Sequence, residues 1–67
     1  MIKLKVKEVA EQKKMSMRKL VKESGIAYNT LRTMYRDPYR PVSTETLDKI
    51  SKALGVDASE LIESVPD

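Results

Sequence analysis

The sequence contains no cysteine and no histidine, and its only aromatic residues are three tyrosines. These absences exclude disulfides, thiol nucleophiles, the usual zinc sites and the Ser–His or Cys–His catalytic pairs. No apolar run approaches the roughly 18 residues that a membrane span needs, and residues 1–5 alternate charged and apolar side chains, so they contain no signal-peptide core. We therefore expect a cytoplasmic protein that is not an enzyme and that uses no metal and no cofactor.

What the sequence does contain is charge, and that charge is unevenly distributed. The chain has 67 residues, 40% hydrophobic and 34% charged, which fits one small globular domain over residues 1–67. Residues 1–40 carry 11 Lys and Arg against four acids, whereas residues 41–67 carry two Lys against six acids. A basic half and an acidic half predict an anionic partner on one side only, either nucleic acid or an anionic membrane surface. The apolar residues near the start of the chain are too few for membrane anchoring, so we expect no membrane partner.

Apolar residues spaced at i, i+3, i+4 and i+7 predict a mostly helical chain. The expected helices cover residues 5–14, 17–24, 28–36, 44–54 and 58–63. A second interpretation of the chain ends stays open, because Ile2, Leu4 and Val6 alternate with lysines. In that interpretation these residues form a short strand that pairs with residues 62–65.

Residues at the expected helix ends agree with these boundaries. Ser16 and Ser43 can cap the second and fourth helices, since a serine oxygen accepts hydrogen bonds from the free N–H groups of a first turn. Gly25 and Gly55 stand where these two helices must stop, and glycine adopts the left-handed conformation required there. Residues 57–60 have the spacing of a capping box for the short fifth helix.

The second and third predicted helices form a helix-turn-helix over residues 17–36, because only Gly25, Ile26 and Ala27 separate them. Counted from Met17, the compact Val21 is fifth and Gly25 is ninth, where the two helices touch and the chain turns. Hydrophobic residues occupy the fourth, tenth, fifteenth and eighteenth positions. In such a motif the outer face of the second helix can enter a DNA major groove.

Together these features resemble the Cro/C1-type repressor domain of the XRE family of phage and bacterial regulators. The resemblance extends over roughly residues 5–63 and rests on residues 15–21, 25–31, 43–47, 52–56 and 60–62. It implies an all-α, five-helix, lambda-repressor-like domain that binds double-stranded DNA as a homodimer on a two-fold symmetric operator. The sequence departs from the family pattern at Met17, Val21 and Ala27. Where this chain has Met17, the family often has a Gln that binds phosphate. Where it has Val21, the family prefers Ala, and where it has Ala27, the family often has a Ser or Thr that caps the helix.

The candidate DNA contacts fall into two groups. Asn29, Arg32, Thr33 and Arg36 share one helical face that carries no acid. The resemblance adds Ala27 and Tyr28 and assigns base contacts to Ala27, Tyr28, Asn29 and Thr33. Asn suits adenine and Arg suits guanine, so Arg32 joins the base-reading set, with phosphate as its other target. The predicted phosphate contacts are Ser16, Arg18, Lys19, Arg36, Tyr39 and Arg40. Two alternatives stay open: Tyr28 as a half-buried ring, and residues 36–40 as an ordinary exposed loop.

The sequence thus predicts a small transcriptional regulator, acting as a repressor by occupying its operator. Leu61, Ile62 and Val65 are the predicted apolar contacts of its dimer. A protein-interaction module with the same fold, such as an antitoxin, is the alternative.

Overall fold

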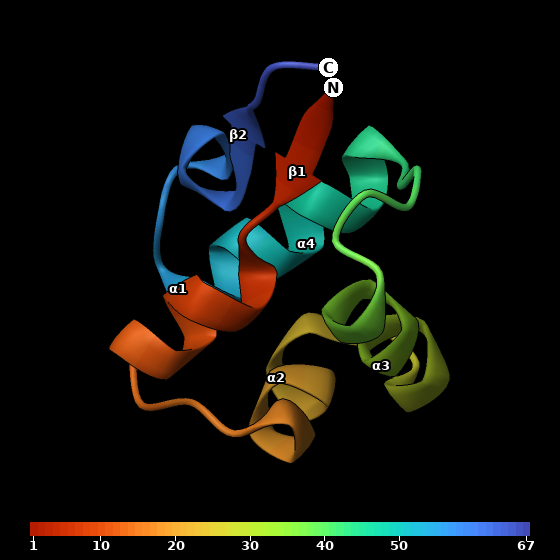
Figure 1. The fold of residues 1–67 in the computed structure, drawn as a ribbon. Coiled ribbons are helices and arrows are strands. Elements are labelled where there is room, and N and C mark those ends of the chain that lie inside the picture. The colour runs from red at the N-terminus through yellow and green to blue at the C-terminus, as the bar shows by residue number, and fades with distance from the viewer.

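Four helices and one pair of short strands make up the computed structural model, which describes residues 1–67 (Figure 1). In chain order the elements are β1 (Ile2–Leu4), α1 (Val6–Gln12), α2 (Met17–Ser24), α3 (Tyr28–Arg36), α4 (Thr44–Leu54), the 3-10 turn η1 (Ala58–Leu61) and β2 (Ile62–Ser64). The bounds of α2, α3 and α4 coincide with the predicted segments. The prediction of five α-helices is wrong, since the fifth segment forms η1 and β2 instead.

The predicted caps of α2 and α4 are confirmed. The hydroxyl oxygen of Ser16 accepts the N–H of Lys19 at 3.2 Å, and that of Ser43 accepts the N–H of Thr46 at 3.1 Å. At the other ends, Gly25 and Gly55 have φ of 75° and 70°, in the left-handed region. Local hydrogen bonding and glycine conformation therefore fix both ends of these two helices.

The first helix is shorter than predicted and ends at Gln12 rather than at residue 14. Lys14 has φ of 54°, so it leaves the right-handed helix. Its N–H bonds to the carbonyl of Glu11 at 3.0 Å, and the N–H of Met15 bonds to the carbonyl of Ala10 at 2.9 Å. This pair of bonds is a Schellman motif, in which a lysine occupies the position that usually favours glycine.

The chain ends pair with each other, which confirms the strand interpretation for Ile2 and Leu4, whereas Val6 begins α1 instead. β1 and β2 run antiparallel, with Ile2 opposite Ser64 and Leu4 opposite Ile62. Only a single 3-10 turn precedes β2, and it begins where the carboxylate of Asp57 accepts the N–H of Ser59 at 2.9 Å. Pairing with β1 requires an extended backbone after residue 61, so the predicted helix over 58–63 cannot continue.

The core is one cluster of eleven buried hydrophobic residues, to which every helix contributes. Leu20, Leu31, Ile50 and Leu61 have no exposed surface, and each such side chain contributes about 1.5–3 kcal/mol when it is buried. The place of Leu61 in this cluster corrects one prediction, because a fully buried side chain cannot be a surface contact of a dimer. No helix combines the length and the apolar composition that crossing a membrane requires.

Candidate nucleic-acid interface

The turn between α2 and α3 is held by hydrogen bonds that fix how the two helices meet. Gly25 donates its N–H to the carbonyl of Val21 at 2.9 Å. The buried hydroxyl of Ser24 donates to the carbonyl of Leu20 and accepts the N–H of Ile26 at 3.2 Å. Ile26 is itself buried in the core. Ser24 was not among the predicted functional residues. A polar residue on the apolar face of α2, directly before the turn glycine, was the signal available in the sequence.

One face of α3 is buried and the opposite face is exposed, as the sequence predicted. Leu31 and Met34 are buried in the core, while Asn29, Arg32 and Arg36 are exposed. Thr33 is half-buried, and its hydroxyl donates to the carbonyl of Asn29 at 2.8 Å. The core contacts of α3 therefore direct an unobstructed polar face toward solvent.

The start of α3 lies open at the surface. Ala27 is exposed and has the extended backbone of an N-cap, with φ of −60° and ψ of 143°, but no side chain caps the helix. The N–H groups of residues 28–30 have no acceptor within the chain. Tyr28, the first residue of the helix, keeps 47% of its surface exposed. The start of α3 thus presents free donors and an aromatic ring to solvent.

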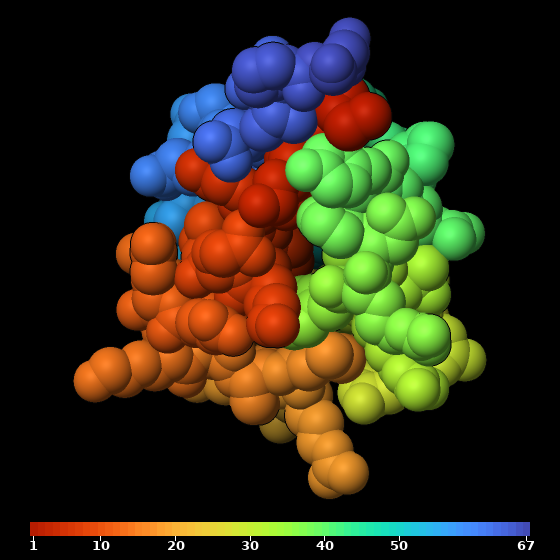
Figure 2. Space-filling view, viewed as in Figure 1, coloured from red at the N-terminus to blue at the C-terminus, as the bar shows by residue number.

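None of the lysines and arginines in residues 1–40 forms an ion pair. The three ion pairs of the chain join the Met1 ammonium to Asp67, Lys49 to Glu45 and Lys52 to Asp48. Arg18 and Lys19, near the start of α2, and the arginines of α3 are all exposed. In Figure 2 the surfaces of α2 and α3 adjoin, at the opposite end of the molecule from the paired chain ends. Unpaired positive charge on adjoining elements is typical of a surface that binds an anionic polymer.

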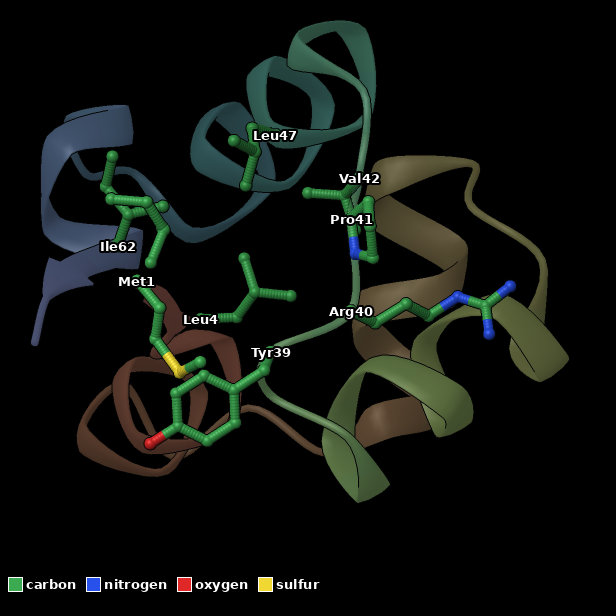
Figure 3. Close-up of a pocket in the computed structure, with 9 residues that line it drawn as sticks. Met1, Leu4, Tyr39, Arg40, Pro41, Val42, Leu47 and Ile62 are labelled. Atoms are coloured by element: carbon green, nitrogen blue, oxygen red, sulfur yellow. The ribbon is translucent and has the colours of Figure 1, made fainter. Parts of the chain in front are cut away.

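The loop after α3 is tied to the rest of the fold. The carboxylate of Asp37 accepts the N–H of Tyr39 at 3.2 Å, and the carbonyl of Pro38 accepts the N–H of Leu4 at 2.6 Å. Tyr39 and Arg40 are exposed, and Figure 3 shows the guanidinium of Arg40 extended away from the neighbouring apolar side chains. These two residues are therefore held beside the end of α3 with their polar groups free.

The sequence profile of the Cro/C1-type HTH DNA-binding domain matches residues 5–67. The chain belongs to this family. A search of curated protein sequences finds no match. Family membership makes α2 and α3 the helix-turn-helix of a DNA-binding domain and makes the chain a DNA-binding regulator.

The predicted dimer contacts of this Cro/C1-type domain do not lie together on one surface. Leu61 is in the core, Val65 is half-buried, and only Ile62 is a large exposed apolar residue, at 36%. The N–H of Val65 bonds to the carbonyl of Met1 at 2.9 Å, so the segment after β2 continues the strand pairing.

Two groups of the Cro/C1-type domain have perturbed acidity. Burial raises the pKa of the Tyr35 hydroxyl above its usual 10.0, and the negative charge of Glu11 raises it further. The hydrogen bonds from Ser59 lower the pKa of Asp57 below its usual 3.8. The Tyr35 hydroxyl is also buried without a hydrogen-bond partner.

Proposed function

We propose that this Cro/C1-type domain is a transcriptional repressor that binds double-stranded DNA as a homodimer and inserts α3 into the major groove. The observation that carries the proposal is the exposed face of α3, which has two unpaired arginines and no acid. A bound dimer would repress by occupying DNA that the polymerase needs.

Base reading is assigned to the first two turns of α3. The exposed amide of Asn29 suits the paired donor and acceptor of adenine, and Arg32 suits the two acceptors of guanine. The hydroxyl proton of Thr33 is already donated to the carbonyl of Asn29. Thr33 therefore offers DNA its methyl group and its oxygen lone pairs rather than a donor. Ala27 and Tyr28 complete the base-reading set, in which the exposed Tyr28 ring would contact a thymine methyl group.

Phosphate contacts flank this face on both sides. The proposed set is Ser16, Arg18, Lys19, Arg36, Tyr39 and Arg40. Since Met17 cannot hydrogen-bond to phosphate, Arg18 takes over that contact at the start of α2, where the helix dipole also favours anions. Phosphate contacts hold any sequence, whereas base contacts create preference among sequences.

The experiment begins by selecting duplexes that bind the protein from a random pool, which gives the operator. Operator and random duplexes are then titrated at several salt concentrations. Asn29→Ala should cost about 1–3 kcal/mol on the operator, less on random DNA, and leave the salt slope nearly unchanged. Arg18→Ala should weaken both duplexes alike and reduce the salt slope by about one.

Matched controls separate these effects from a general loss of the fold. Gln12→Ala removes an exposed amide from α1, and Lys52→Ala removes a charge that is already paired with Asp48. Both variants should bind like the wild type. An operator-to-random ratio that Asn29→Ala leaves unchanged would contradict base reading by that residue. Failure to select any duplex would overturn the proposed function and bring forward the antitoxin alternative, which the family match does not favour.

A further inference from the structure

An apolar groove lies between the paired chain ends and the loop that follows α3. Its volume is about 390 Å³, and seven of its nine lining residues are hydrophobic. Figure 3 shows the side chains of several of these residues, from β1, β2, the loop and α4, arranged around one space. Four of the five exposed large hydrophobic residues of the chain line this groove: Met1, Ile2, Tyr39 and Ile62. Such a concentration of exposed apolar surface on so small a domain is typical of an interaction surface.

The two flanks of the groove carry opposite charge. On one flank, the stem of Arg40 lines the groove, and its guanidinium extends beyond the rim without an ion pair (Figure 3). On the other flank, Leu47 and Ile62 also line a second hollow, which contains Glu45 and Asp48. The surface therefore runs from a basic flank, across an apolar centre, to an acidic flank.

We propose that this groove is the contact surface between two copies of the chain, related by a two-fold axis that passes close to Leu47 and Ile62. A two-fold interface brings the same patch of both copies together, so each flank meets the opposite flank of the other copy. Arg40 of one copy then faces Glu45 and Asp48 of the second copy, while the apolar centres cover each other. This inference deepens the proposed function, and it rests on that function because two half-sites require two copies.

The existing ion pairs of the acidic flank do not oppose this arrangement. Glu45 and Asp48 pair with lysines one turn further along the exposed side of α4, at 3.4 Å and 3.0 Å. Exposed pairs of this kind are weak, whereas a guanidinium can bind a carboxylate through two hydrogen bonds. The charges are therefore available to set the relative position of the two copies.

The free edge of β2 is the other surface at which two copies could meet. Antiparallel pairing of two β2 strands about Glu63 would place two carboxylates directly opposite each other, and like charges in that position are destabilising. The groove has no such conflict. Val65, a dimer contact predicted from the sequence, does not line the groove.

The first test measures association of the full chain by sedimentation equilibrium without DNA, up to hundreds of micromolar. The wild type should form a dimer that weakens as salt is raised. Ile2→Ser and Ile62→Ser should each weaken it about tenfold or more, because both remove exposed apolar surface from the contact. Val65→Ser, the matched control outside the groove, should leave the dimer unchanged. Circular dichroism of each variant identifies any that fails to fold, and either groove variant alone suffices for the test.

The second test reverses the charges. Arg40→Glu and Glu45→Arg should each weaken the dimer about threefold to tenfold, as expected for charges at the rim of an interface. Their combination should restore it, because the pair is re-formed with opposite polarity. Glu8→Arg, on the exposed side of α1 and outside the groove, makes the same change of net charge as Glu45→Arg and should have no effect. These variants are measured without DNA because Arg40 is also a proposed phosphate contact.

The outcomes separate this inference from the proposed function. A strictly monomeric wild type, a dimer insensitive to the groove variants, or a double charge reversal that fails to restore association would each overturn the groove contact. A groove-dependent dimer that binds no duplex would leave the inference intact and overturn the proposed function instead.

Discussion

The uncapped start of α3 gives a prediction whose geometry can be taken from two capped helices of the same chain. Ser16 and Ser43 cap α2 and α4 with φ of −71° and −76° and ψ of 161° and 153°. Ala27 has nearly the same backbone, with φ of −60° and ψ of 143°, but lacks the hydroxyl. In Ala27→Ser the new oxygen should accept the N–H of Thr30 at a distance like those at the two existing caps, 3.2 Å and 3.1 Å. Because Ala27 is exposed, the hydroxyl is not buried by the change.

The expected gain is about 0.5–2 kcal/mol in the free energy of unfolding. For a domain of this size, each kcal/mol corresponds to a rise of about 4–8 °C in Tm. Urea unfolding should show a higher midpoint with an unchanged slope, which marks a change in stability rather than in compactness. Ser16→Ala and Ser43→Ala are the matched controls and should each lose a similar amount. If both controls lose stability but Ala27→Ser gains none, the helix does not begin at Tyr28 and the reasoning fails.

Three further changes test features of the fold by the same unfolding assay. Lys14→Gly should stabilise by about 0.5–1 kcal/mol, because glycine adopts the left-handed conformation without the penalty of a Cβ; no gain would contradict the positive φ. Tyr35→Phe should stabilise by about 1 kcal/mol by removing an unpaired buried hydroxyl. It should also abolish the loss of stability that the raised Tyr35 pKa predicts for the wild type above about pH 10. Asp57→Ala should destabilise at neutral pH, and the difference should shrink as the pH falls through the lowered pKa of Asp57, because the ionised carboxylate accepts the hydrogen bonds from Ser59 more strongly than the protonated acid does.

Sequence reasoning located the parts of the fold that depend on local interactions. The bounds of α2, α3 and α4 follow from apolar spacing together with residues that act within one turn, such as the Ser16 cap and the turn glycine Gly25. The polar face of α3 follows in the same way, because Leu31 and Met34 fix which side of the helix is buried. The candidate interface on α2 and α3 was therefore largely predictable from local sequence patterns.

The chain ends were harder to predict because distant residues determine them. The sequence after residue 57 has helix-like spacing, but the backbone of residues 62–64 pairs with residues 2–4 at the far end of the chain. Periodicity within a window cannot show such pairing. The same pairing places Leu61 in the core and assembles the groove from four separate elements. No local pattern indicated the end of α1 either, because Lys14 lacks the usual signature of a left-handed residue.

The pairing of β1 with β2 also has a consequence for how the chain folds. The contacts that α2 makes with α3 and with α4 enclose much shorter stretches of chain than the strand pair does. The strand pair closes a loop of nearly the whole chain and requires a correspondingly larger loss of chain entropy. The helices should therefore assemble first and the ends should meet last. The groove, built from both ends, does not exist until that final step. A partner that binds in the groove would therefore bind only chains whose ends have already paired. By mass action, such binding would stabilise the strand pair, which is the part of the molecule that forms last.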